Sequence, residues 1–135
     1  LIGQAAVRSE TFRSLVETID ASDGIVYVEE GRCARGVRAC FVGVTDAGPN
    51  RLLHVVVDTR KAEWDLMGSI GHELRHTIEV LSDPRVRSSV QMHFFYAREG
   101  RPGTGEGTFE TAAAVEAGQN VRKEVRNHQR RMKGK

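Results

Sequence analysis

The sequence predicts an α+β fold with a small, mostly antiparallel sheet of three to four strands. Three observations predict it: an amphipathic stretch near the start, a set of short strand-like runs between turn signals, and long helical patterns in the second half. The length of 135 residues predicts one compact domain over residues 1–135, with enough apolar residues, 39%, for a single core. Its apolar runs are far shorter than the roughly 20 residues of a membrane span, and we expect no membrane partner.

The first half of the chain predicts one helix followed by the strands. Residues 5–20 carry apolar side chains at helical spacing, and the polar segment Asp20–Gly24 ends the pattern. The strand-like runs are residues 25–30, 39–45 and 52–58. A Gly- and Arg-rich turn joins the first two runs, and a turn around Gly48 and Pro49 joins the last two. Successive hairpins of this kind predict antiparallel pairing.

The second half predicts helices that pack on this sheet. In order, the expected elements are a long helix over residues 62–82, a short helix over 90–98, a glycine-rich and mobile loop over 99–108, and a final helix over 109–132. Pro84 sets the end of the long helix, because proline disfavours helical geometry in the residue before it.

Two cysteines flank the first turn. The spacing of Cys33 and Cys40 suits a disulfide across the neck of a hairpin, with two free buried thiols as the alternative. A disulfide implies an oxidising compartment, and the chain does not begin with methionine, so we expect a secreted or periplasmic protein. The pair lacks the spacing of a zinc-binding cysteine motif.

The net charge of +2 conceals a basic end. Residues 122–135 contain seven basic side chains against the acidic Glu124. Such a cluster could bind nucleic acid or an anionic surface, but basic residues are also favoured at the carboxyl end of a helix by its dipole. No aromatic residue lies there to stack on a base, so we expect a solvated helix end and no nucleic-acid partner.

The segment that carries chemistry is His-Glu-Leu-Arg-His at residues 72–76, inside the predicted long helix. On a helix, His72 and His76 lie one turn apart on the side opposite the apolar stripe, where both imidazoles can reach one metal ion. Glu73 flanks the pair and can hold and deprotonate a water molecule. Small residues at 68, 69 and 71 would let another element approach closely. The alternative is an ordinary polar face of a solvated helix.

This motif resembles the active-site helix of the zincin metallopeptidases, in which a sheet precedes an HExxH helix. The resemblance implies one Zn²⁺ held by His72 and His76, with Glu73 as the catalytic general base. It excludes the metzincin type, because Glu79 and Ser82 stand where that type has glycine and a third histidine.

A gluzincin-like site, completed by a glutamate from a later helix, is the remaining type, and Glu110 is our candidate third metal ligand. The small residues that follow it would let the final helix lie close, and the Glu-Thr-x-Ala-Ala run is similar to small bacterial putative metallopeptidases. Gluzincins often have a second acidic residue four positions later, where this chain has Ala114. Glu110 could instead complement a helix dipole, with Thr108 as the cap. The competing ligands are Glu99, Glu106, Glu116 and His93.

Other polar residues are candidates for supporting roles. Glu79 shares the face of the histidines and could accept an N–H from an imidazole or pair with an arginine. Asp65 could act similarly or serve as a carboxylate of the first helical turn. His93 and Tyr96 are catalytic candidates that could stabilise the oxyanion, although each could equally be a packed or surface side chain.

The predicted function is therefore that of a zinc-dependent metallopeptidase, a hydrolase acting on a peptide or protein substrate. By similarity to zincins, the substrate backbone would pair with the sheet edge at residues 39–45. One alternative is a zinc-binding protein without turnover that acts as a binding or regulatory module. The other is a protein that binds through its basic end and whose histidines are incidental. The sequence carries no prediction of oligomeric state.

Overall fold

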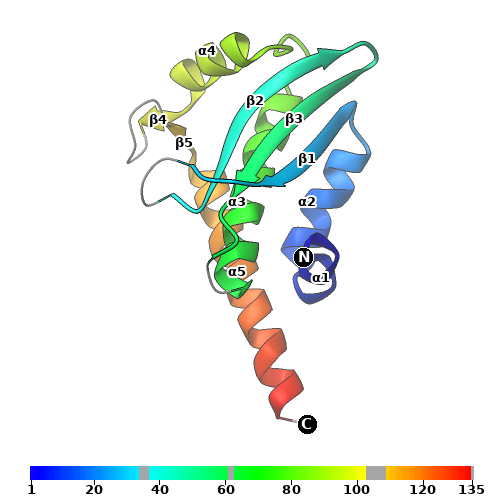
Figure 1. Ribbon diagram of the computed structural model, residues 1–135, viewed down its shortest axis with the longest axis vertical. Coiled ribbons are helices and arrows are strands. Elements are labelled where there is room, and N and C mark those ends of the chain that lie inside the picture. Colours follow the sequence, from blue (N-terminus) through cyan, green and yellow to red (C-terminus); the bar gives the residue numbers. More distant parts are fainter. Residues whose placement is uncertain (34–36, 61–62, 103–108, 135) are drawn as a thin grey trace.

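The computed structural model describes residues 1–33, 37–60, 63–102 and 109–134 and shows an α+β fold (Figure 1). The elements along the chain are α1 (Ile2–Arg8), α2 (Glu10–Asp20), β1 (Gly24–Glu30), β2 (Ala39–Ala47), β3 (Asn50–Val57), α3 (Glu63–Leu81), α4 (Ser89–Glu99), β4 (Arg101–Pro102), β5 (Phe109–Glu110) and α5 (Ala112–Lys133). The first three strands form one sheet, and the short β4 and β5 pair separately. Most of the predicted loop, residues 103–108, lies outside the described residues.

The main sheet is mixed, which corrects the prediction of a mostly antiparallel sheet of up to four strands. Its strand order is β1-β3-β2, with β2 antiparallel and β1 parallel to the central β3. The β2–β3 hairpin was predicted correctly, and its turn contains Gly48 at a positive φ of 70°. β1 and β2 do not form a hairpin, because they are not neighbours in the sheet. β3 lies between them. Local composition marks a strand but does not state its neighbour, so this order could not be predicted.

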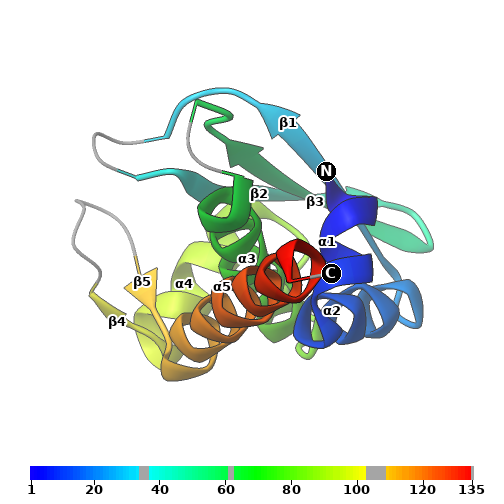
Figure 2. The ribbon, with the colours of Figure 1, turned by 90° about the horizontal axis from the view of Figure 1, so that it is seen from below.

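The helices cover one face of the sheet. Figure 2 shows the three strands as one layer, with α2, α3 and α5 beneath them. Leu53, Val55 and Val57 of β3 are buried in the helix-facing core together with Ile70 and Leu74 of α3. The side chains of Ile25 and Tyr27 lie on the opposite, exposed face of the sheet. The strict alternation of buried and partly exposed residues along β3 directs its apolar side chains toward α3.

The predicted helix over residues 5–20 is two helices with a break at Ser9. Ser9 has an extended backbone, and its hydroxyl accepts a hydrogen bond from the amide of Phe12 at the start of α2. The same hydroxyl donates to Glu124 of α5, which also accepts hydrogen bonds from Thr11. A serine cap is the physical reason for the break, because it satisfies an amide that has no partner within the helix.

The long helices α3 and α5 cross closely, as the small residues of α3 predict. A side chain added at Gly68 would meet Arg122 at 2.2 Å, and one at Gly71 would meet Val121 at 2.8 Å. On the facing helix, a side chain at Gly118 would come within 3.1 Å of the His72 side chain. Glycines at these three positions therefore let α5 lie against the face of α3 that carries the histidines.

The carboxyl end of α3 is held by a buried arginine from β3. Arg51 is only 2% exposed, and its guanidinium donates to both carboxylate oxygens of Asp23 at 2.8 Å. It also donates to the carbonyl groups of Val80, Leu81, Asp83 and Val86. Arg51 thus satisfies helix-end carbonyls that lack intrahelical partners and fixes α3 to the sheet.

The predicted disulfide is confirmed: Cys33 and Cys40 are bonded, with Cα atoms 6.0 Å apart. It spans the β1–β2 connection rather than the neck of a hairpin, because β1 and β2 are not neighbours. Among the described residues, no helix is long and apolar enough to cross a membrane.

The basic end of α5 is partly engaged within the fold. Arg122 donates to Asp65 at 2.9 Å, and the Arg126 guanidinium lies 4.8 Å from the centre of the Trp64 ring. The last turns of α5 extend away from the sheet (Figure 1).

Candidate metal centre

Three of the predicted ligands converge at one point. A nitrogen of His72, a nitrogen of His76 and a carboxylate oxygen of Glu110 lie within 4.8 Å of one another. The Nε2 atoms of His72 and His76 are 2.8 and 2.9 Å from the same oxygen, Glu110 Oε1. Glu110 is 38 positions from His72 and 34 from His76 in the chain. The fold therefore brings together two imidazoles and a carboxylate from distant segments.

Different elements supply these donors. His72 and His76 lie one turn apart on α3, with their rings edge to face at a centroid distance of 4.9 Å. Glu110 is the last residue of β5, immediately before Thr111, which caps α5. Glu110 therefore precedes the helix, and the alternative of a first-turn glutamate with Thr108 as the cap does not apply: the cap is Thr111, whose hydroxyl accepts from the amide of Ala114.

A second set of hydrogen bonds holds His76 at Nδ1 and at its backbone carbonyl, away from the atom that faces Glu110. Its Nδ1 lies 2.8 Å from Glu79 Oε1, as predicted for a supporting carboxylate. The other oxygen, Glu79 Oε2, accepts a hydrogen bond of 2.5 Å from the hydroxyl of Thr111. The Tyr96 hydroxyl lies 2.7 Å from the carbonyl oxygen of His76 and 3.2 Å from Glu79 Oε1. Both the ring and the backbone of His76 are thereby fixed.

The charges of this cluster are coupled. Burial acts to lower the pKa of His76, but hydrogen bonds to Glu110 and Glu79 outweigh it and raise the pKa to about 9. Burial acts to raise the pKa of Glu110, but hydrogen bonds from His72 and His76 lower it to about 2. Glu79 is similar: burial is outweighed by its bonds to His76 and Thr111, and its pKa lies below the ordinary value.

Glu73 lies beside the cluster without joining it. Burial raises its pKa to about 7, although the neighbouring charges of His76 and His72 act in the opposite direction. The backbone amide of Phe41 in β2 also acts to lower the pKa of Glu73. Phe41 lies at a β-bulge, where the β2–β3 register shifts between Phe41 and Gly43. The edge strand β2 thus lies near the predicted base.

The other predicted residues lie elsewhere or in different roles. Tyr96 is 5% exposed and contacts the back of His76, a position that favours support of a ligand over contact with a substrate oxyanion. His93 is exposed on α4, with its ring against Phe94, and is not part of the three-residue cluster. Asp65 pairs with Arg38 and Arg122.

The competing third ligands that the structure describes also lie outside the cluster. Glu99 is exposed and pairs with Arg98 at 3.2 Å, and Glu116 is exposed on α5. Glu106 lies outside the described residues. Among the described candidates, Glu110 alone is joined to both histidines.

Two functional features were missed by the sequence reasoning. The first is Thr111, a residue type favoured at helix N-caps that stands directly before an alanine-rich run, a signal that could have been found. The second is the influence of the Phe41 amide on the pKa of Glu73, which depends on how β2 packs over α3 and not on a local sequence pattern.

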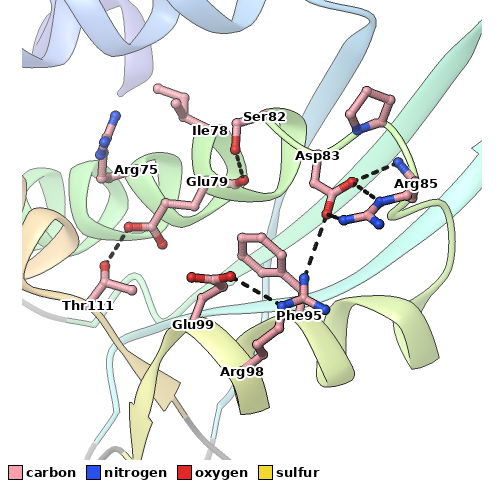
Figure 3. Close-up of a pocket in the computed structure, with 11 residues that line it drawn as sticks. Arg75, Ile78, Glu79, Ser82, Asp83, Arg85, Phe95, Arg98, Glu99 and Thr111 are labelled. Carbon is pink, nitrogen blue, oxygen red and sulfur yellow. Dashed lines mark hydrogen bonds and ion pairs between the residues drawn. The ribbon is translucent and has the colours of Figure 1, made fainter.

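A pocket of about 880 Å³ lies next to the supporting network rather than at the donors (Figure 3). Glu79 and Thr111 line it from α3 and the start of α5, facing Phe95 and Arg98 of α4. Water can therefore reach the side of Glu79 that is remote from the metal ligands.

The donor set fits a zinc ion. Zinc takes imidazole nitrogen and carboxylate oxygen in a tetrahedron, and ligand atoms about 2.0–2.1 Å from the ion are then roughly 3.3 Å apart. The donor atoms here lie within 4.8 Å of one another. Glu110 Oε1 shares hydrogen bonds with the Nε2 atoms of His72 and His76, and a bound ion would take the place of the protons in these bonds. Comparison with protein families, curated proteins and solved structures gave no match.

Proposed function

We propose that this protein is a zinc-dependent metallopeptidase of gluzincin-like type that hydrolyses peptide bonds. The observation that carries the proposal is the convergence of His72, His76 and Glu110 beside a half-buried Glu73. A structural ion pair would not need a further carboxylate next to two imidazoles. Two histidines with one carboxylate leave a fourth position open, which is the ligand count of catalytic rather than structural zinc sites.

When bound, zinc supplies Lewis acidity that polarises a carbonyl group and makes water acidic near neutral pH. His72, His76 and Glu110 would hold it, and Glu79 directs the Nε2 atom of His76 toward it by accepting the Nδ1–H.

Glu73 carries the proton through the reaction. It takes a proton from water as the oxygen adds to the scissile carbonyl carbon, and it gives that proton to the amine nitrogen as the C–N bond breaks. Burial raises the pKa of this carboxyl in the metal-free protein, which makes it a stronger base than an exposed glutamate.

The edge strand β2 is the proposed binding surface for the substrate backbone. It lies at one edge of the sheet, and the backbone amide of its Phe41 lies near enough to Glu73 to act on the pKa of that carboxyl, so an extended peptide paired with this strand would pass near the catalytic base. The disulfide supports action outside the cytoplasm, and we propose a secreted or periplasmic enzyme.

The decisive experiment compares the zinc-loaded protein with its Glu73→Gln variant. We expect the wild type to cleave members of a synthetic peptide library, detected by mass spectrometry, and Glu73→Gln to lose at least about 100-fold in rate because the proton carrier is gone. Both should bind one zinc per chain by elemental analysis. The matched control is Glu116→Gln, an exposed glutamate outside the cluster, which should keep full activity.

The other outcomes are equally informative. Zinc uptake by the wild type without any cleavage would identify a zinc-binding protein without turnover. Cleavage that survives in Glu73→Gln would overturn the mechanism. Loss of zinc in His72→Ala together with its retention in Glu110→Ala would remove Glu110 from the ligand set.

A further inference from the structure

The hydroxyl of Thr111 occupies an unusual place in the site. It accepts a hydrogen bond of 3.2 Å from the Ala114 amide, so it caps α5, and it donates one of 2.5 Å to Glu79 Oε2. A threonine hydroxyl has one proton and two lone pairs, so it can do both at once. Figure 3 shows Thr111 and the Glu79 carboxylate facing one another across the start of α5.

The partner of Thr111 is the carboxylate that orients His76. Glu79 Oε1 accepts from His76 Nδ1, and Thr111 holds the remaining oxygen, so both ends of the carboxylate are fixed. A carboxylate held at both oxygens cannot rotate about its last bond without losing one partner. The orientation of the His76 ring is thus set through Glu79 by the residue at the start of α5.

Thr111 is also joined by one peptide bond to Glu110. The Glu110 carboxylate reaches the Nε2 atoms of His72 and His76, while the Thr111 side chain reaches the opposite side of His76 through Glu79. Two consecutive residues therefore fix both ring nitrogens of His76: Glu110 contacts Nε2 directly, and Thr111 acts on Nδ1 through Glu79. Movement of the α5 start would disturb both contacts together.

We propose that Thr111 is a positioning residue for the metal centre, coupling the cap of α5 to the placement of His76 and Glu110. This inference rests on the proposed function, because it assigns Thr111 a role toward the zinc ion. Its role is to stabilise the arrangement of donors before the ion arrives, so its loss lowers zinc affinity and alters the coordination geometry.

Four variants separate this role from simple helix capping. Thr111→Val keeps the shape, removes both hydrogen bonds and fills the space that water from the adjacent pocket could enter. Thr111→Ser keeps both hydrogen bonds. Thr111→Asp keeps the cap but cannot donate to Glu79. Ser88→Ala removes the cap of α4, whose hydroxyl accepts from Gln91, and is the matched control for cap loss away from the centre.

The measurements are zinc affinity by competition with a chromophoric chelator and the visible absorption spectrum of the Co²⁺-substituted protein. We expect Thr111→Val and Thr111→Asp to lose 10- to 100-fold in zinc affinity, the range found for partners of metal-bound histidines, with a changed Co²⁺ spectrum. Thr111→Ser should stay within about threefold of the wild type, a rescue that a merely apolar packing role would not give. Ser88→Ala should lower the melting temperature while leaving affinity and spectrum unchanged.

Two results would count against the proposal and are distinguishable. If the wild type binds zinc and Thr111→Val binds it equally well, losing only melting temperature, Thr111 is a helix cap and the inference is wrong while the proposed function stands. If the wild type takes up no zinc, the proposed function fails at its first step. Zinc binding without hydrolysis would overturn the enzymatic function and leave the Thr111 inference to be judged by affinity alone.

Discussion

At the scale of single residues, His76 is held by a carboxylate at each of its two ring nitrogens. Its Nδ1 faces Glu79 and its Nε2 faces Glu110, and its side chain is 6% exposed. Without a metal ion, both ring nitrogens carry protons that are shared with carboxylates, which is why the pKa is raised to about 9. Binding of zinc through Nε2 must displace one of those protons.

Zinc affinity should therefore rise with pH. Below pH 9, His76 of the metal-free protein is protonated, so zinc competes with a proton, and affinity falls as the pH is lowered. Between pH 6.5 and 8 we expect the affinity to rise by at least about tenfold for each pH unit, with release of at least about one proton per ion at pH 7. Calorimetry in two buffers of different ionisation enthalpy measures the released protons.

His54 provides the control for this experiment. It pairs with Glu29 on the sheet, away from the cluster, so His54→Gln should release the same number of protons as the wild type. Binding that released no proton at pH 7 would show that His76 is neutral in the metal-free protein or is not a ligand.

The residues of the candidate centre could be predicted in part. The i, i+4 spacing of His72 and His76 fixes their common face by helix geometry alone, and the small residues around the predicted crossing pointed to Glu110. The position of Tyr96 behind His76 could not be predicted, because it depends on how α4 packs against α3 and not on any pattern in α4 itself.

At the scale of elements, α3 depends on a single side chain at its carboxyl end. Arg51 is buried and makes six hydrogen bonds, two of them to Asp23 and the rest to carbonyl groups at and after the end of α3. An arginine in a strand sequence is usually interpreted as solvent-exposed, so this clamp could not be predicted from the sequence. Its partners come from two separate parts of the chain, Asp23 and residues 80–86.

Replacement of Arg51 should strongly destabilise the fold. We expect Arg51→Met to lower the free energy of unfolding by about 3–5 kcal/mol, because it leaves the Asp23 carboxylate and several carbonyl groups without their buried partner. Urea denaturation of the metal-free protein measures this change without a contribution from metal binding.

Arg85→Met is the comparison at an exposed site. The Arg85 side chain is 82% exposed and pairs with Asp83, so its loss should cost less than about 1 kcal/mol. Equal effects of the two substitutions would mean that the buried clamp contributes no more than a surface ion pair.

At the scale of the whole molecule, one layer of strands covers one layer of helices, and the candidate centre lies where α3, the start of α5 and the edge strand β2 meet. The sequence predicted the elements and the α+β class well, because periodicity and turn residues are local signals. It did not predict that β3 lies between β1 and β2, since this depends on pairing between residues far apart in the chain.

The disulfide should stabilise the whole fold rather than only its own loop. Cys33 and Cys40 are seven positions apart. Closing a loop of this size lowers the entropy of the unfolded chain and so raises the free energy of unfolding by about 2.5 kcal/mol. We therefore expect the double variant Cys33→Ser, Cys40→Ser to lose about that much free energy of unfolding. Wild type treated with a reductant should match the variant, and stability unchanged in both would contradict this assignment.

The parallel pairing of β1 with β3 also sets an order of events during synthesis. β1 leaves the ribosome first, yet its partner in the sheet is the last of the three strands to be made. The β2–β3 hairpin can close as soon as its turn has emerged, within microseconds for such a local structure. The nascent chain therefore carries β1 with an unsatisfied backbone until translation has passed Val57, and premature release or pausing within β2 would leave a strand open to association with other chains.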